Sequence, residues 1–215
     1  MKYKAVLYDM DGTVLDTLDD LTDAVNAALR RFGFAAQPRS HVRKALGNGA
    51  RRLIMGCLPE NVDPAAAEAV LEFYKPYYDA HCREKTAPYP GITALMQSLR
   101  DAGVKQAVVS NKPDSAVKEL AELFFHGLIE SAVGESETVR LKPCPDAVLA
   151  AAKLMGVSKD ECVYVGDSEV DIETARNAGM DCISVAWGFR NEDMLRAEGA
   201  SLIVHNADEL FEALK

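Results

Sequence analysis

The chain has 215 residues, of which 48% are hydrophobic, and this is enough to bury the core of one large domain or of two unequal ones. A formal net charge of −9 argues against nucleic acid or an acidic membrane surface as a partner. Because no apolar run approaches the ~20 residues that span a bilayer, we expect no membrane segment.

An apolar strand predicted over residues 5–9 runs directly into two carboxylates, Asp9 and Asp11, which Gly12 and Thr13 follow. A parallel strand buried on both faces is almost wholly apolar, so its carboxyl end is the first place where polar side chains can reach a ligand. Positions i and i+2 of an extended chain point the same way, so both carboxylates can face one small site. Two like charges this close favour a divalent cation between them. The alternative is a plain turn, in which an aspartate bonds its own backbone.

A helical segment follows this strand. Apolar residues recur at intervals of three and four after Asp16 and predict a helix that ends at Gly33. Three further helices are expected, one from after Pro38 to Gly47, one from about Ala50 to Cys57, and one from after Pro64 to about His81. We therefore expect residues 17–86 to form a small all-helical cap, inserted into a core made of residues 1–16 and 87–215.

Helices and strands alternate in the rest of the chain. The predicted strands cover residues 105–109, 131–133, 162–165, 182–185 and about 202–204. The predicted helices cover residues 92–102, 114–123, 145–155, 169–178 and 207–214, and residues 191–199 are expected to form a polar helix or a loop. This alternation predicts an α/β fold with a doubly wound, Rossmann-like parallel sheet.

Polar side chains follow three of these strands. Ser110 and Asn111 follow the first, and Asp167 and Asp171 follow the third. Lys142 lies beyond the second, where neighbouring prolines keep it out of a helix. Because the carboxyl ends of parallel strands lie along one edge of a sheet, we expect these residues to converge on the two aspartates of the first strand.

The chain resembles the haloacid dehalogenase-like superfamily, because four motifs stand in that family's order over essentially the whole sequence. The motifs are Asp9-x-Asp11-Gly12-Thr13, Ser110, Lys142 and Gly166-Asp167-x-x-x-Asp171. Each motif alone is weak, but four in order, each after an apolar strand, are specific. Within the superfamily the chain is most similar to the phosphoglycolate phosphatase group, which it resembles in Asp16-Thr17 and in Gly47-Asn48-Gly49-Ala50.

The resemblance implies a Mg²⁺-dependent phosphatase with an aspartyl-phosphate intermediate. Asp9 would attack the phosphorus, and Asp11 would protonate the leaving alkoxide and later deprotonate the water. An Asp9 oxygen, the backbone carbonyl of Asp11 and Asp167 would hold the Mg²⁺. Asp171 would support the metal through water or orient Lys142, and its alternative role is to cap or solvate the following helix.

The resemblance also implies which residues hold the phosphoryl group. Lys142 and Ser110 would neutralise and bond its equatorial oxygens. Free amides in the turn at Gly12 and Thr13, and the backbone of Asn111, would add donors. The alternatives are a helix cap for Ser110 and an exposed loop lysine for Lys142.

The helical cap is expected to select the substrate, because a lid over catalytic loops excludes water and contacts the leaving group. Gly49 and Arg51 are candidate contacts to a carboxylate or phosphate of the substrate. Gly49 belongs to a flexible segment whose free amides can face outward, and the cation of Arg51 gains little from the dipole at a helix start. The alternative is a solvated pair, Arg51 and Arg52. The group implies a small phosphorylated carboxylate such as 2-phosphoglycolate.

Other functions stay open to different degrees. A phosphosugar mutase keeps the aspartate pair and differs mainly in the lid, and related phosphatases act on sugar phosphates, nucleotides or pyrophosphate. A dehalogenase lacks a second aspartate at the position of Asp11. A receiver domain of a signalling protein also combines an aspartate, a hydroxyl residue and a lysine, but it is shorter and has no helical insertion.

The cysteines and the first residues of the chain indicate where the protein is expected to be located. Five cysteines without a CxxC pair are typical of reduced thiols in a cytoplasmic protein. Residues 1–4 lead directly into the first strand, which leaves no room for a signal peptide. We expect a monomer or a homodimer whose partner is a small-molecule phosphate ester.

Overall fold

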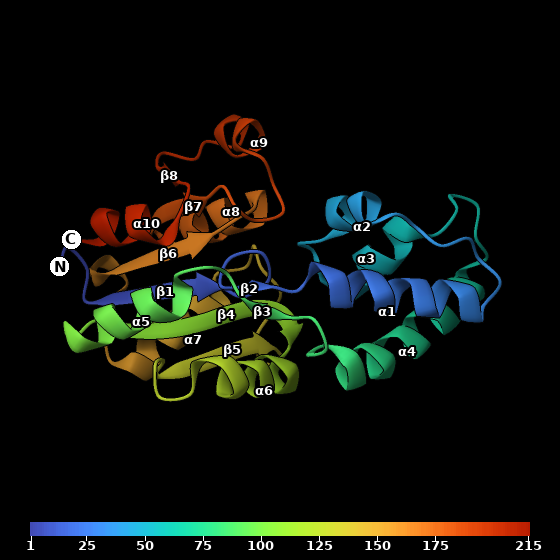
Figure 1. Ribbon diagram of the computed structural model, residues 1–215, viewed down its shortest axis with the longest axis horizontal. Helices are drawn as coiled ribbons and strands as arrows, with labels where there is room; N and C mark the ends of the chain where they lie inside the picture. Colours follow the sequence, from blue (N-terminus) through green and yellow to red (C-terminus); the bar gives the residue numbers. More distant parts are fainter. The chain divides into compact units, whose positions relative to one another are not determined.

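The computed structural model describes residues 1–215, which divide into two compact units. One unit consists of Met1–Leu15 and Pro88–Lys215, and the other of Asp16–Ala87. Figure 1 traces how the chain leaves the first unit after its first strand and returns to it near residue 88.

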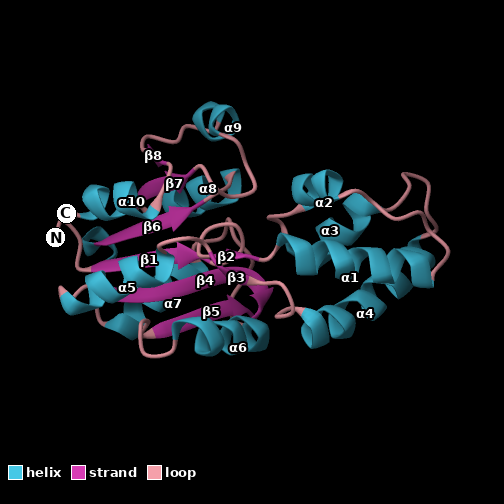
Figure 2. Ribbon diagram, in the orientation of Figure 1, coloured by secondary structure: helices cyan, strands magenta, loops and turns pink.

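The first unit is built on a parallel sheet (Figure 2). Its strands are β1 (Ala5–Asp9), β4 (Lys105–Pro113), β5 (Ser131–Glu135), β6 (Cys162–Gly166), β7 (Asp181–Val185) and β8 (Ile203–Val204). They lie in the order β5-β4-β1-β6-β7-β8, and every neighbouring pair is parallel. The doubly wound parallel sheet predicted from the sequence is thereby confirmed. The order runs outward from β1 on both sides, and such a switch point opens a crevice at the carboxyl ends of the strands.

Helices cover both faces of this sheet (Figure 1). The helices of this unit are α5 (Ile92–Asp101), α6 (Asp114–Phe125), α7 (Asp146–Met155), α8 (Glu169–Ala178), α9 (Glu192–Ala197) and α10 (Ala207–Leu214), with a short 3-10 turn at Lys159–Glu161, and α9 lies away from the sheet. Leu7 of β1 and Tyr164 of β6 belong to the core cluster under α7 and α8. Tyr8 points to the opposite face, where its hydroxyl donates to Gln106, which in turn donates to the carbonyl of Met96 in α5. Successive side chains of β1 thus point to opposite faces of the sheet and pack in the helical layers on either side of it.

β4 extends further than the sequence predicts. The predicted strand ends at Val109, whereas β4 continues to Pro113 across an irregularity in its pairing with β5. Ser110, Asn111 and Lys112 therefore lie in extended backbone instead of a loop, and their side chains alternate in direction. The sequence did not predict this extension because its residues are mostly polar, whereas a buried strand is predicted from an apolar run.

The second unit is helical. It contains α1 (Leu18–Arg31), α2 (Arg39–Ala45), α3 (Gly49–Cys57) and α4 (Pro64–His81), which correspond to the four helices predicted for this segment. The buried carboxylate of Asp20 in α1 accepts hydrogen bonds from the backbone N–H groups of Lys85 and Thr86 and from the Thr86 hydroxyl. The end of the segment is thereby fixed to its first helix.

Two short strands mark the points where the chain passes between the units. They are β2 (Leu15–Asp16) and β3 (Ala87–Pro88), and together they form a two-stranded sheet that the sequence did not predict. Strands of two residues show no periodicity, so sequence patterns do not reveal them. None of the helices in either unit combines the length and the apolar character that crossing a bilayer requires.

Candidate active site

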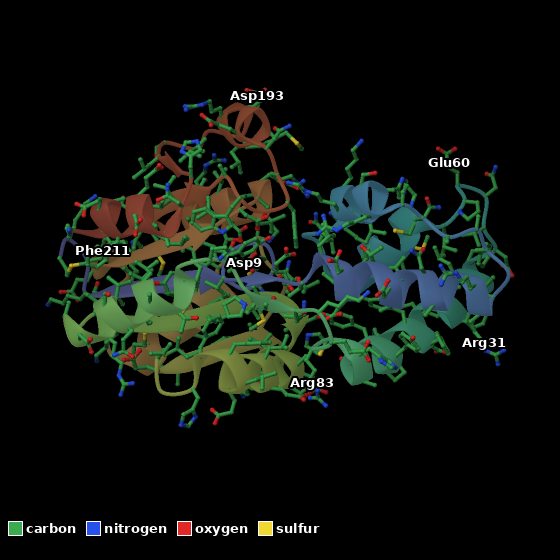
Figure 3. All side chains as sticks on the ribbon, viewed as in Figure 1. Asp9, Arg31, Glu60, Arg83, Asp193 and Phe211 are labelled. Atoms are coloured by element: carbon green, nitrogen blue, oxygen red, sulfur yellow. The ribbon has the colours of Figure 1, made fainter.

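The first strand delivers Asp9 to the carboxyl end of the sheet (Figure 3). There the Nζ of Lys142 donates to Oδ1 of Asp9 at 2.7 Å and to Oδ1 of Asp171 at 2.7 Å. The side chains of Lys142 and Asp171 are almost fully buried, with exposed fractions of 3% and 1%. The structure therefore brings these three residues together from three separate segments of the chain.

Asn111 holds the backbone of Lys142 in place. Its Oδ1 accepts a hydrogen bond from the N–H of Lys142 at 2.6 Å, and its Nδ2 donates to the Lys142 carbonyl oxygen at 3.1 Å. One side chain thus satisfies both polar groups of a residue outside regular secondary structure. A contact between the backbone of Asn111 and phosphate stays a prediction.

Asp171 uses its two carboxylate oxygens differently. Oδ2 accepts from the N–H of Ser168 at 3.1 Å and from its hydroxyl at 2.6 Å, which caps α8. Oδ1 accepts from Lys142 and, at 3.1 Å, from the hydroxyl of Tyr164. The helix cap and the contact with Lys142, which the sequence offered as alternatives, are therefore present together. Support of a metal by Asp171 stays a prediction.

Asp167 follows β6 and is buried at the same end of the sheet. Its Oδ1 accepts from the hydroxyl of Thr13 at 3.3 Å, and its Oδ2 accepts from the N–H of Phe189 at 2.5 Å. Gly12 has a φ of +86°, and a Cβ there would lie 2.5 Å from Oδ2 of Asp167. A Cβ on Gly188 would also collide with the Asp167 side chain. Two glycines therefore allow the backbone to pack directly on this carboxylate.

Residues 186–190, which follow β7 and are called the β7 loop below, are fixed by side-chain contacts. The Nε1 of Trp187 donates to the carbonyl oxygen of Thr13 at 3.0 Å. Arg190 is buried and binds both carboxylate oxygens of Glu169, at 2.7 Å and 2.9 Å. A bidentate pair of this kind is strong and directional. Trp187 and Arg190 thereby fix the loop on either side of Phe189, whose N–H donates to Asp167.

Asp11 lies two residues beyond Asp9, and β4 supports its carboxylate. The hydroxyl of Ser110 donates to Oδ2 of Asp11 at 3.4 Å, and the ammonium of Lys112 forms an ion pair with Oδ1. Residues 110 and 112 point the same way along extended backbone, so both reach the same carboxylate. A contact between Ser110 and a phosphoryl oxygen stays a prediction.

The turn after Asp9 uses its own polar groups. The N–H of Gly12 donates to the carbonyl oxygen of Leu15 at 2.9 Å, and the hydroxyl of Thr13 is engaged by Asp167. The prediction of a free amide at Gly12 is therefore wrong, because the tight turn consumes that donor. Binding of phosphate by Thr13 stays a prediction.

Gly49 and Arg51 belong to the helical unit. Gly49 is the first residue of α3, and Arg51 forms a bidentate ion pair with Glu68, at 2.6 Å and 2.9 Å. The side chain of Arg51 keeps an exposed fraction of 64%. Contact of either residue with a substrate stays a prediction.

The buried carboxylates at this end of the sheet fit a divalent cation. Asp9, Asp167 and Asp171 each offer an oxygen, and these oxygens lie within 4.8 Å of one another. One ammonium, that of Lys142, lies among three carboxylates, so negative charge is in excess. A hard cation that prefers oxygen ligands, such as Mg²⁺, matches both the donors and the charge.

The shifted pKa values of the buried groups also indicate an excess of negative charge at this site. Burial and the charge of Asp171 raise the pKa of Asp9 well above its usual range, although Lys142 acts in the opposite direction. Burial, with a contribution from Asp171, raises the pKa of Asp167 to about 7. Burial opposes the charge on Lys142, but Asp171 and Asp9 outweigh it and hold the pKa of Lys142 well above its ordinary value. The carboxylates are thus short of positive charge.

Three features of the site were not identified from the sequence. They are the ion pair of Lys112 with Asp11, the hydroxyl of Tyr164 beside Lys142, and the β7 loop. Tyr164 stands inside an apolar run and reads as a core residue. A tyrosine in a strand buried on both faces nevertheless needs a partner for its hydroxyl, and that requirement is the signal that could have identified Tyr164 as part of the site.

The chain is similar to known proteins along almost its whole length. A family model described as haloacid dehalogenase-like hydrolase matches residues 6–185. A phosphoglycolate phosphatase of Xanthomonas campestris pv. campestris (strain 8004) is 32% identical over 212 residues, which cover 97% of this chain and 95% of that protein. An N-acetylmuramic acid 6-phosphate phosphatase of Pseudomonas aeruginosa is 31% identical over 216 residues, covering 100% of this chain and 96% of that protein.

A solved structure is similar over the full length. The crystal structure of a provisionally assigned phosphoglycolate phosphatase from Lactobacillus delbrueckii subsp. bulgaricus matches with a TM-score of 0.96 and 44% sequence identity. The match covers 100% of this chain and 99% of that chain. Sequence and structure comparisons therefore point to one family over the whole chain.

Proposed function

The chain belongs to the haloacid dehalogenase-like hydrolase family, and on that premise we propose that this phosphatase hydrolyses a small phosphate monoester through an aspartyl phosphate formed on Asp9. The observation that carries the proposal is the buried cluster at the carboxyl end of the sheet. There Asp9 lies beside the ammonium of Lys142 and near Asp167, with Asp11 two residues away. A nucleophile, a cation and an acid/base group are the parts that stepwise phosphoryl transfer needs.

In the first step, a carboxylate oxygen of Asp9 forms a bond to phosphorus while the bond from phosphorus to the ester oxygen breaks. The leaving alkoxide takes a proton from the carboxyl group of Asp11. In the second step, Asp11 accepts a proton from water, whose oxygen bonds to phosphorus as the aspartyl–phosphorus bond breaks. Inorganic phosphate and an alcohol are the products, and both aspartates return to their starting state.

Neighbouring side chains orient these two aspartates. Lys142 holds Oδ1 of Asp9, and it would also neutralise the negative charge that spreads over the phosphoryl oxygens in the transition state. Ser110 and Lys112 hold the carboxylate of Asp11 from the β4 side. Preorganised contacts of this kind lower the barrier because no side chain has to move as the charge develops.

Oxygens of Asp9 and Asp167 and the backbone carbonyl of Asp11 are the groups that would hold Mg²⁺. When bound there, the cation supplies positive charge that lets a phosphate ester approach a buried group of carboxylates. Thr13 and the amide of Phe189 orient Asp167 for this role. Such outer contacts commonly tune the affinity of a metal site.

For the substrate we propose a 2-phosphoglycolate-like ester. Phosphoglycolate phosphatases are among the relatives that match this chain along almost its whole length. A phosphorylated sugar acid is the second candidate, because a relative of similar identity carries the name N-acetylmuramic acid 6-phosphate phosphatase. A phosphosugar mutase, a nucleotidase and a pyrophosphatase are the further alternatives.

A panel of phosphate esters tests the proposal. Each ester is offered with Mg²⁺ and scored by kcat/KM, and released phosphate is counted per enzyme molecule. We expect many turnovers and the highest kcat/KM on 2-phosphoglycolate. Release of about one equivalent would instead indicate a receiver-like phosphoacceptor, and transfer to a sugar would indicate a mutase.

A further inference from the structure

The ammonium of Lys142 has three N–H donors, and the structure provides an acceptor for each. Two are the carboxylate oxygens of Asp9 and Asp171, both at 2.7 Å. The third is the hydroxyl oxygen of Tyr164, at 2.9 Å. That hydroxyl donates its own hydrogen to Oδ1 of Asp171 at 3.1 Å, so that Lys142, Tyr164 and Asp171 form a closed ring of hydrogen bonds.

Tyr164 is well placed to hold Lys142 without taking part in the chemistry. It lies in the middle of β6, is fully buried, and pairs in register with Leu7 of β1. An ammonium can only donate, so the Tyr164 oxygen accepts from Lys142, and the single hydrogen of the hydroxyl is left for the carboxylate of Asp171. Its two hydrogen bonds therefore have a fixed direction, accepting from Lys142 and donating to Asp171.

We propose that Tyr164 is a positioning residue for the hydrolysis proposed above: together with Asp171 it fixes two N–H bonds of Lys142, so that the third is directed at Asp9 and at the phosphoryl group it receives. The inference rests on the proposed function. It follows from the tetrahedral geometry of an ammonium, in which fixing two N–H directions determines the third.

Removing the hydroxyl would release this constraint. Once Asp9 binds the phosphoryl group, Asp171 would be the one fixed acceptor left for Lys142, and a single fixed N–H bond leaves the other two free to turn within the buried site. The direction of the N–H bond matters most when charge develops on the phosphoryl oxygens, because the transition state is more sensitive to donor geometry than the bound ester. The loss should therefore fall on kcat more than on KM.

The test is Tyr164→Phe, which removes one oxygen and keeps the ring, whose centroid lies 5.6 Å from Nζ of Lys142. Tyr8→Phe is a matched control. Tyr8 is also fully buried, in the neighbouring strand β1, but its hydroxyl donates to Gln106 at 3.0 Å on the opposite face of the sheet. Both variants lose one buried hydroxyl, so both should show a similar fall in Tm.

We expect Tyr164→Phe to lower kcat by about 10- to 100-fold, with KM changed by less than about threefold, and Tyr8→Phe to leave both near wild type. Orthovanadate, a mimic of the phosphoryl-transfer transition state, should bind Tyr164→Phe in the presence of Mg²⁺ more weakly by a similar factor. Inorganic phosphate, a ground-state ligand, should lose less affinity. Ligand binding is measured by thermal shift and needs no turnover.

Two results overturn the inference: equal kcat values for the two variants, or equal losses of vanadate and phosphate affinity in Tyr164→Phe. Failure of the proposed function looks different. In that case the wild type itself releases no phosphate from any ester in the panel, while the vanadate comparison still decides whether Tyr164 positions Lys142.

Discussion

Lys142 and Asp9 form a buried ion pair, with 2.7 Å between Nζ and Oδ1, although 133 residues separate them in the chain. The pair exists because parallel strands end along one edge of the sheet, where the segment after β5 meets the end of β1. Both groups are desolvated, so each depends on the other for its charge. This dependence makes Asp9 the most informative residue to change.

Asp9→Asn should reduce kcat by about 10³-fold or more, because an amide oxygen is a poor nucleophile at phosphorus and forms no stable acyl phosphate. The substitution preserves the shape of the side chain, so the circular dichroism spectrum should remain that of the wild type. Steady-state phosphate release measures the effect. A variant with near-normal kcat would remove Asp9 from the role of nucleophile.

Asp11→Asn should slow the hydrolysis of an ester more strongly when the leaving group of that ester depends more on protonation. For alkyl phosphates we expect kcat to fall by about 10²- to 10⁴-fold, whereas p-nitrophenyl phosphate should lose less than about tenfold. The two esters are compared on the same enzyme preparation, so partial unfolding would affect both equally. An equal loss on both would argue against Asp11 as the general acid.

The fold of the first unit could be predicted from the sequence because buried parallel strands are continuous apolar runs between helical patterns. Such runs identified β1, β6 and β7 and the order of elements around them. The extension of β4 through Pro113 and the two-residue strands β2 and β3 were missed, since their pairing depends on tertiary contacts instead of local periodicity.

The site was predictable to the extent that its residues follow apolar strands. Asp9, Lys142 and Asp171 do so, and the structure brings them together. The free amide at Gly12 was wrongly predicted, because the sequence does not show which carbonyl a turn amide will meet. The amide of Phe189 was missed for a related reason: any residue has an N–H, so only the packing of the loop singles one out.

Removal of divalent cations should stop turnover, and restoring Mg²⁺ should recover it. Mg²⁺ should also raise the Tm of the wild type in a concentration-dependent manner, because a ligand that binds only the native state stabilises it. In Asp167→Asn the increase should be much smaller, since one anionic ligand is lost. Phosphate release after exhaustive chelation would exclude the metal from the mechanism.

The stability of the cation-free protein should depend on pH through Asp167. Its pKa is raised from 3.8 to about 7 in the native state, so the carboxyl destabilises the fold when it ionises. The native state binds the proton more tightly than the unfolded state, so the destabilisation is absent at low pH and grows as the pH rises between these two values.

In chelator, the Tm of the wild type minus that of Asp167→Asn should therefore decrease from about pH 5 to about pH 8. Asp167→Asn is the reference because its amide carries no charge at either pH, and other titrating groups largely cancel in the difference. Mg²⁺ should stabilise the wild type more at the higher pH, where its ligands are ionised. A difference in Tm that stays constant over this interval would contradict the raised pKa.

The predicted role of Arg51 can be separated from its ion pair with Glu68. Arg51→Ala and Glu68→Ala both break the pair, which is largely exposed and therefore contributes little to stability. Only Arg51→Ala also removes the cation that would meet a carboxylate or phosphate of the substrate. We expect Arg51→Ala to raise KM for 2-phosphoglycolate by about tenfold, the loss of one charge-assisted hydrogen bond, and Glu68→Ala to leave it unchanged. Arg52→Ala removes a neighbouring arginine that contacts Asn48, and it controls for a general loss of positive charge. If Arg51→Ala and Glu68→Ala give the same KM, the guanidinium serves only the helical unit, and substrate selection must lie with other residues.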